Sequence, residues 1–251
     1  MSVIELKGAK IYVNDSIDEL VKSLSEHFCE IYDKAVAERG RFTVALSGGT
    51  TPKSLYEMLA TDAYRNRFDW NKVFFFWGDE RCVPHTHPDS NYGMVKKALL
   101  DKIEIPAKNV VMTDGQENDP EGSAKRYEEK IYGTFGHYGD VPRFDICLLG
   151  LGPDGHTASL FPDSAALKQR EHIFVANYVA KFQAWRLTAT YTLINKSHNV
   201  IFLVAGDSKA SIVKDIFQSE TKKYPAQLVQ PESGKLEWYT DRAAVAGLGG
   251  G

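Results

Sequence analysis

A glycine-rich segment in the middle of the chain carries the residue best suited to acid–base chemistry. His156 stands in the run Gly150-Leu151-Gly152-Pro153-Asp154-Gly155-His156-Thr157, which follows the apolar stretch FDICLLG. An imidazole titrates near neutral pH, and a nearby carboxylate can fix which ring nitrogen carries the proton. A single histidine is more often structural, but its place in a glycine-rich loop after a strand puts a catalytic role level with a structural one. We therefore take His156 as the candidate general base and Asp154 as the residue that orients it.

A second run of small residues is typical of an anion site. It lies between the stretches FTVAL and PKSLYEML, and its glycines allow close approach to backbone N–H groups. Thr51 is expected to cap the following helix, with Pro52 in its first turn. A helix N-terminus favours phosphate, and the lack of nucleotide-binding signatures favours a monophosphate. The alternative is a purely structural turn. The candidate substrate-binding residues are Ser47, Gly48, Gly49 and Thr50.

A cluster of charges follows the apolar run VFFFW. Arg81 offers a bidentate fork for phosphate, or a fixed cation for a developing oxyanion. Asp79 or Glu80 could hold that arginine in place. The alternative is a salt bridge at the rim of a cleft, which would contribute little. We take Arg81 as a candidate catalytic residue and Asp79 as a candidate substrate-binding residue.

Neither the histidines nor the cysteines predict a metal or a disulfide. His85 and His87 form a His-x-His pattern, but no third ligand has convincing spacing, so a solvated loop is expected. The three cysteines have no C-x-x-C spacing, which suits a reducing compartment. We expect no metal and no cofactor.

Residues that act together must be brought to one place, and the elements between them indicate how. Short apolar runs alternate with longer amphipathic segments, and several runs are apolar on successive residues, as in strands covered on both faces. The predicted strands are Lys10–Val13, Phe42–Leu46, Val73–Gly78, Val110–Thr113, Phe144–Leu149, Ile173–Tyr178, Arg186–Leu193, Val200–Val204 and Leu236–Tyr239. The predicted helices are Ile17–Glu38, Pro52–Leu59, Ser90–Leu100, Glu121–Phe135 and Ser208–Phe217.

This alternation predicts an α/β fold: one Rossmann-like domain over residues 1–251, with a mostly parallel sheet and helices on both faces. Residues from about 244 to 251 are expected to form a frayed tail. Ligands bind at the carboxyl ends of the strands in such sheets, and each of the three motifs follows a strand.

The composition excludes several classes of protein. The chain has a formal net charge of −3 and no basic block, which argues against nucleic acid or a lipid surface as partner. No run is long and apolar enough for a secretory signal or a membrane span. We expect a cytoplasmic monomer that acts on a small molecule.

Taken together, the loops resemble the 6-phosphogluconolactonase family, within the wider glucosamine-6-phosphate isomerase/deaminase-like superfamily. The similarity runs in order from about Val13 to Ala244. Its matching segments are Leu46–Gly49, Asp79–Arg81, Asp89–Gly93, Leu149–Pro162, Arg186–Thr190, Pro225–Pro231, Gly234-Lys235 and Trp238.

The resemblance implies a Rossmann-like fold without a nucleotide. It implies metal-free hydrolysis of 6-phospho-D-glucono-1,5-lactone, the second step of the oxidative pentose phosphate pathway. The family's catalytic histidine falls on His156 and its arginine on Arg81. Relatives often carry a Lys-Pro-Pro loop that is absent here, where the stretch reads AKFQAWR. Lys181 and Arg186 are the candidates for retained substrate contacts.

Two rival functions are weighed against this one. Glucosamine-6-phosphate deaminases typically have tyrosine where this chain has Arg81, and a glutamate where it has Phe161. A sugar-phosphate-sensing regulator would carry a separate DNA-binding segment, and this chain has no helix-turn-helix pattern. The favoured hypothesis is that His156 activates water against the lactone carbonyl, while Arg81, Arg186 or backbone N–H groups stabilise the oxyanion.

Overall fold

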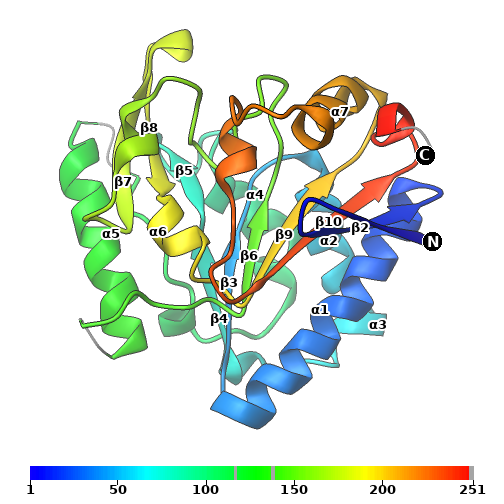
Figure 1. The fold of residues 1–251 in the computed structure, drawn as a ribbon. Coiled ribbons are helices and arrows are strands. Elements are labelled where there is room, and N and C mark those ends of the chain that lie inside the picture. Colours follow the sequence, from blue (N-terminus) through cyan, green and yellow to red (C-terminus); the bar gives the residue numbers. More distant parts are fainter. Residues whose placement is uncertain (116–117, 137–138, 249–251) are drawn as a thin grey trace.

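The protein is an α/β fold built on two sheets (Figure 1), and the computed structural model describes residues 1–115, 118–136 and 139–248. The larger sheet has seven strands in the order β1-β2-β10-β9-β6-β3-β4. Its neighbours pair in parallel, except β1 and β2, which are antiparallel. The strands of this sheet are β1 (Ser2–Leu6), β2 (Ala9–Asn14), β3 (Phe42–Leu46), β4 (Val73–Trp77), β6 (Ile146–Leu149), β9 (Asn199–Val204) and β10 (Lys235–Asp241).

Helices cover both faces of this sheet, as the sequence predicted. Side chains of α1 to α4 pack into one hydrophobic core and those of α5 to α7 into another. Figure 1 shows α1 and α5 on opposite sides of the sheet. The helices are α1 (Ile17–Arg39), α2 (Thr50–Leu59), α3 (Asp62–Arg65), α4 (Asn91–Ala98), α5 (Pro120–Phe135), α6 (Tyr191–Ile194) and α7 (Ala210–Gln218).

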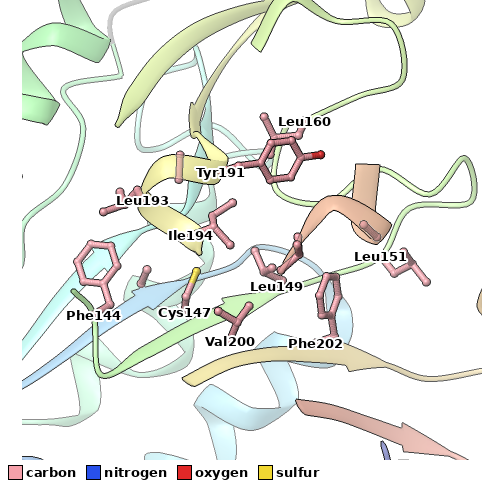
Figure 2. Close-up of a cluster of buried hydrophobic side chains, with 14 of the residues drawn as sticks. Phe144, Cys147, Leu149, Leu151, Leu160, Tyr191, Leu193, Ile194, Val200 and Phe202 are labelled. Carbon is pink, nitrogen blue, oxygen red and sulfur yellow. The ribbon is translucent and has the colours of Figure 1, made fainter. Parts of the chain in front are cut away.

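The central strands are apolar on successive residues because each face of the sheet lies in a different core. In β6, Cys147 and Leu149 belong to one core, and Ile146 and Leu148 belong to the other. Figure 2 shows the first of these cores, with Cys147 and Leu149 beneath side chains of α6. Side chains alternate along a strand, so a strand buried on both faces needs apolar residues at every position.

A second, antiparallel sheet carries one wall of the candidate site. It has three strands in the order β5-β8-β7, namely β5 (Asp79–Arg81), β8 (Ala184–Ala189) and β7 (Phe174–Val179). The chain passes from one sheet to the other at Gly78, whose N–H donates to Leu46 of β3 and whose carbonyl accepts from Ala189. The acidic and basic residues after β4 therefore stand on a strand of their own.

One predicted strand is wrong and another is too long. Val110–Thr113 is not a strand, because Val110 makes only an isolated parallel bridge to Phe75 of β4. The predicted strand Arg186–Leu193 ends early: β8 stops at Ala189, and α6 begins at Tyr191. Tyr191, Leu193 and Ile194 are all buried, and a short helix buries such apolar residues as well as a strand does. Strands β1 and β5 were not predicted.

Local details differ at the start of α2 and at the end of the chain. Helix α2 begins at Thr50 with Gly49 as its N-cap, so the expected capping by Thr51 is wrong. Ala244 is buried and residues 246–248 form a short 3-10 turn beside α7, so this part of the expected tail is packed. Residues 249–251 lie outside the described residues. In the described part of the chain, no helix is long and apolar enough to span a bilayer.

Candidate active site

A cavity of about 420 Å³ lies at the carboxyl ends of β3, β6 and β9, and it brings the three predicted motifs together. The loops after β3 and β6 form two of its walls, and β5 contributes another. Its lining residues are Ser47, Gly48, Gly49, Thr50, Thr51, Pro52, Asp79, Arg81, Asn91, Gly150, Leu151, Gly152, Pro153, His156, Ala158, Leu203, Val204, Ala205, Ser208 and Lys209. The volume is within the range of small-molecule sites.

The imidazole of His156 is held by a carboxylate on the same loop. Nδ1 of His156 contacts Oδ1 of Asp154, and the main-chain N–H of His156 also donates to that oxygen. A carboxylate on Nδ1 favours the tautomer that carries its proton there and leaves a lone pair on Nε2. The ring is about a quarter exposed and lines the cavity. The arrangement suits a general base.

Asp154 stays ionised because Lys181 and His156 both contact its carboxylate. Nζ of Lys181 lies 3.1 Å from Oδ2 of Asp154, and His156 occupies the other oxygen. Burial alone would raise the pKa of Asp154, but the hydrogen bond and charge of His156, together with the bond from Lys181, lower it to about 2. The carboxylate is therefore charged throughout the neutral pH range.

The backbone of this loop leaves no spare room around the ring. A Cβ at Gly152 would overlap Cε1 and Nδ1 of His156. Gly155 has a φ of 74°, and its carbonyl accepts from Ala226. Ala158 also has a positive φ, 47°, a conformation that costs a non-glycine residue energy and is frequent at functional sites. The position of the histidine thus explains Gly152, whereas Gly155 is required by its backbone conformation and by the nearby ring of Tyr224.

An aromatic side chain supports one face of the His156 ring. Phe161 stacks on His156 with ring centroids 4.0 Å apart and an interplanar angle of 26°. Phe182, between β7 and β8, packs edge-on against Phe161 at 5.6 Å. The ring of His156 is therefore restrained by Asp154 in its plane and by Phe161 on its face.

The turn after β3 presents backbone N–H groups to the cavity. Tyr56 of α2 fixes Ser47, since its hydroxyl accepts from the Ser47 N–H at 3.0 Å and donates to the Ser47 carbonyl at 2.7 Å. Gly49 has a φ of 107°, which only glycine adopts readily, and no side chain caps α2. The first amides of a helix have no intrahelical partner, so those of Thr50 and Thr51 are available to an anion.

Gly48 is required by a neighbour that the sequence analysis did not select. A Cβ at Gly48 would overlap the side-chain amide of Asn91. Asn91 is buried, lines the cavity, and donates from Nδ2 to the carbonyl of Asp79 at 2.9 Å. Its place in the segment Asp89–Gly93 was the signal that could have identified it.

In the described part of the chain, neither Asp79 nor Glu80 forms an ion pair with the guanidinium of Arg81. Nη1 of Arg81 donates instead to the main-chain oxygen of Asp89 at 2.6 Å, and the guanidinium lines the cavity. Asp79 is buried and accepts from the hydroxyl of Ser159 at 2.7 Å. Both residues line or approach the cavity, and Glu80 holds Arg81 only through its main chain, since Oε1 of Glu80 accepts from the Arg81 N–H at 2.7 Å.

Glu80 has a structural role at the start of α4. Its carboxylate accepts from the N–H groups of Asn91 and Tyr92, each at 2.7 Å, and from the hydroxyl of Ser90. Burial raises the pKa of Glu80, and these main-chain donors oppose that shift. A carboxylate at a helix N-terminus is stabilised by the helix dipole. Glu80 thus fixes the helix that carries Asn91.

Lys181 and Arg186, the two candidates for substrate contacts, do not line the cavity. Lys181 contacts Asp154 and lines a neighbouring hollow beside Phe161 and Tyr178. Arg186 of β8 lies directly opposite Arg81 of β5 in the small sheet. Burial, and then the charge of Arg81, lower the pKa of Arg186. Within the described residues neither arginine forms an ion pair, although the charges of Asp79 and Asp89 oppose the effect of Arg81 on Arg186.

Lys209 is the functional candidate that sequence reasoning missed. It lies after β9, lines the cavity, and donates from Nζ to the carbonyl of Leu151 at 2.8 Å. The run GDSK directly follows the buried strand VIFLVA, so Lys209 met the criterion applied to the other three loops. Among the residues that the structure describes, no group of three or more histidine, cysteine or acidic side chains could hold a metal.

The comparisons with known proteins agree on one family. The family model described as glucosamine-6-phosphate isomerases/6-phosphogluconolactonase matches residues 15–238. The chain is 45% identical to a 6-phosphogluconolactonase of Synechocystis over 86% of this chain and 88% of that protein. It is 40% identical to one of Haemophilus influenzae over 80% of this chain and 85% of that protein.

Solved structures show the same similarity in three dimensions. A 6-phosphogluconolactonase from Trypanosoma cruzi superposes with a TM-score of 0.86 at 30% identity, with 99% of each chain covered. One from Leishmania guyanensis superposes with a TM-score of 0.84 at 29% identity, over 96% of this chain and 98% of that one.

Proposed function

The chain belongs to the glucosamine-6-phosphate isomerase/6-phosphogluconolactonase family, and we propose that it hydrolyses 6-phospho-D-glucono-1,5-lactone to 6-phospho-D-gluconate. The observation that carries this proposal is the shared cavity. A histidine with a carboxylate on Nδ1 lines the same 420 Å³ space as the free amides at the start of α2. The cavity offers a base for the ester end of the substrate and an anion-binding site for its phosphate end.

His156 acts as the general base in this proposal. Water bonded to Nε2 attacks C1 of the lactone, and its proton passes to Nε2 as the C1–oxygen bond forms. Asp154 stabilises the imidazolium that results. When the tetrahedral intermediate collapses, the bond between C1 and the ring oxygen breaks, and Nε2–H returns the proton to that oxygen. The carboxylic acid product then releases a proton to solvent. In this proposal the reaction needs no metal ion and forms no covalent bond between the substrate and the enzyme.

The phosphate is placed at the start of α2. The amides of Gly49, Thr50 and Thr51 supply donors, and Lys209 supplies a positive charge across the cavity. Lys209 is positioned by its bond to Leu151. Binding energy from the phosphate then orients C1 against the water, which is how remote contacts raise the rate of a chemical step.

Arg81 is assigned to the developing oxyanion. Its guanidinium lines the cavity that contains His156, and its bond to the Asp89 carbonyl restrains it. A fixed cation favours the tetrahedral intermediate over the neutral carbonyl. Arg186, opposite Arg81 in the small sheet, adds to the positive potential at this wall. Lys181 is assigned an indirect role, because it contacts Asp154.

Two substrates test the proposed function. The chain is incubated with freshly prepared 6-phosphogluconolactone and, separately, with glucosamine 6-phosphate, while acid release and ammonia are followed. We expect acid release well above the spontaneous rate with the first substrate and no ammonia with the second. Ammonia release without accelerated lactone hydrolysis would assign the chain to the deaminase branch of the family.

A further inference from the structure

A second cavity, of about 450 Å³, lies at the opposite end of the central strands from the active site. It is formed by the segments that enter β3, β6 and β9, together with the last residues of α1 and α5. With about 3.3 Å of rise per residue, the five residues of β3 separate the two sites by roughly 15 Å. Its lining residues are Arg39, Arg41, Thr43, Phe135, Asp140, Val141, Arg143, Asp145, Lys196 and His198.

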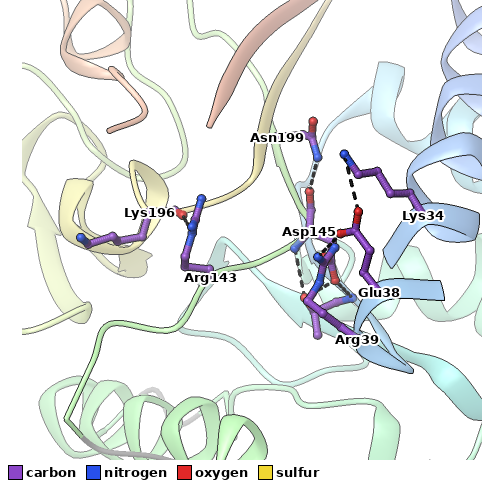
Figure 3. Close-up of polar contacts among 8 residues, drawn as sticks. Lys34, Glu38, Arg39, Arg143, Asp145, Lys196 and Asn199 are labelled. Carbon is purple, nitrogen blue, oxygen red and sulfur yellow. Dashed lines mark hydrogen bonds and ion pairs between the residues drawn. The ribbon is translucent and has the colours of Figure 1, made fainter. Parts of the chain in front are cut away.

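Some of the charges in this cavity are already compensated. Arg39 donates to Oδ1 of Asp145 from both Nε and Nη2, and Thr43 donates to Oδ2 from its N–H and its hydroxyl. Lys196 pairs with Glu232 at 2.6 Å. Figure 3 shows Arg39 in contact with Asp145. Arg143 lies on the segment that enters β6, as Asp145 does, and Lys196 lies beside Arg143.

Two arginines in the cavity have no carboxylate partner among the residues that the structure describes. Arg41 donates to the Thr134 carbonyl at 3.0 Å, and its guanidinium lies over the ring of Phe135. Nε of Arg143 donates to the Lys196 carbonyl at 2.8 Å. Both side chains are half-buried, and neither forms an ion pair within the described part of the chain. Asp140, the remaining acid of the lining, is exposed and makes no such pair either.

The titration of a nearby histidine agrees with an excess of positive charge. His198 lines the same cavity, and burial lowers its pKa. The charges of Arg143 and Arg39 lower it further, against the opposing effects of Asp145 and Glu38. Half-buried guanidiniums repel one another in such a space unless an anion lies between them.

We propose that this cavity binds a small phosphate monoester at a second site, distinct from the active site. Guanidinium forks match the oxygens of a phosphate group, and arginine is the preferred residue for such recognition. The cavity is larger than a phosphate ion needs, and Phe135 and Val141 give it an apolar wall for an organic group. Arg41 and Arg143 hold the phosphate, and Thr43 and His198 lie beside it.

Site-resolved NMR tests this proposal without relying on the enzymatic reaction. The ¹⁵N-labelled chain is titrated with glycerol 3-phosphate and, separately, with inorganic phosphate. The amides of Thr43, Asp145 and His198 report on the second site, and those of Gly48 and Gly49 report on the active site. We expect saturable shifts at both groups of amides, with glycerol 3-phosphate bound more tightly than inorganic phosphate at the second site.

Paired variants separate the second site from the active site. In Arg41→Gln/Arg143→Gln we expect the dissociation constant reported by the amides of Thr43, Asp145 and His198 to rise at least tenfold. The constant reported by Gly48 and Gly49 should not change. The single variant Arg143→Gln is the fallback if the double variant does not fold. The matched control, Arg65→Gln/Arg67→Gln, removes two exposed charges that do not line the cavity and should change neither constant.

Three results would overturn the proposal. Thr43, Asp145 and His198 could show no saturable shift in the unaltered chain. Their dissociation constant could be the same in Arg41→Gln/Arg143→Gln as in the control pair. Equal affinity for the two ligands would contradict the assignment of a monoester and identify free phosphate as the occupant.

Discussion

The side chains of His156 and Asp154 stand two residues apart on one loop and contact each other through Nδ1 and Oδ1. This contact determines which nitrogen of the ring is left for chemistry. The other carboxylate oxygen is held by Lys181 at 3.1 Å. His156, Asp154 and Lys181 therefore form a connected row of three polar side chains, two from the loop after β6 and one from the segment between β7 and β8.

The first prediction concerns Asp154→Asn and activity. An asparagine can present its NH2 group to Nδ1 and so favour the tautomer that has no lone pair on Nε2. We expect kcat to fall on the order of 10²- to 10⁴-fold, as when the orienting carboxylate of a catalytic histidine is lost. The acid limb of kcat/KM should also move to lower pH, because the imidazolium loses its stabilising negative charge. Steady-state kinetics between pH 5 and 9 measure both effects, and an unshifted limb with normal kcat would remove the orienting role.

A second prediction concerns the same variant and stability. The pKa of Asp154 is lowered to about 2 in the folded chain, against about 3.9 for an unfolded aspartate. The carboxylate therefore stabilises the fold above pH 4, and that contribution is lost as the pH falls towards 2. We expect Asp154→Asn to have a lower Tm than the unaltered chain at pH 7, with the difference narrowing below pH 4. Thermal unfolding at several pH values tests this, and a difference that grows in acid would contradict it.

The third prediction concerns Gly152→Ala, which places a methyl group against the His156 imidazole. In Gly152→Ala the new Cβ would overlap Cε1 and Nδ1 of His156, so the imidazole must move. A displacement of about 1 Å in a catalytic group can cost about 10²-fold in rate. We expect a loss of that order in kcat, with the chain still folded. Gly139→Ala is the matched control, because its Cβ meets nothing within 4 Å. Equal kcat in the two variants would show that the ring tolerates the shift.

The fourth prediction concerns Lys209→Ala. A hydrogen bond to a charged group contributes about 1.5–3 kcal/mol, so its loss should raise KM for the lactone by about 10- to 100-fold. The effect on kcat should be smaller, because Lys209 is assigned to the phosphate and not to the reacting carbon. Lys125→Ala, on the exposed side of α5, is the control. A fall in kcat with unchanged KM would move Lys209 from the phosphate to the chemistry.

Much of this site could be predicted from the sequence because three of its loops directly follow strands of a parallel sheet. His156, Ser47–Thr50 and Arg81 each come after an apolar run, and the topology brings the ends of those runs together. Lys209 satisfies the same rule and was missed because one lysine after Gly-Asp-Ser has no distinctive pattern. Asn91 could not be found from chemistry alone, since its role depends on the missing side chain of Gly48.

The parts of the fold that were not predicted depend on tertiary packing. The three residues of β5 are charged and have no apolar alternation, and they form a strand only because β8 pairs with them. The same pairing places Arg186 beside Arg81, far apart in sequence. The contact of Lys181 with Asp154 likewise follows from the return of the chain between β7 and β8.

The most direct test of the account is the pH dependence of kcat for His156→Gln, whose side chain is close to isosteric with imidazole but cannot accept a proton near neutral pH. We predict that kcat falls about 10²- to 10⁴-fold, that KM changes far less, and that the acid limb of the unaltered chain disappears. Lactone hydrolysis at a near-normal rate with the limb retained would show that another group activates the water, and the assignment of His156 would be wrong.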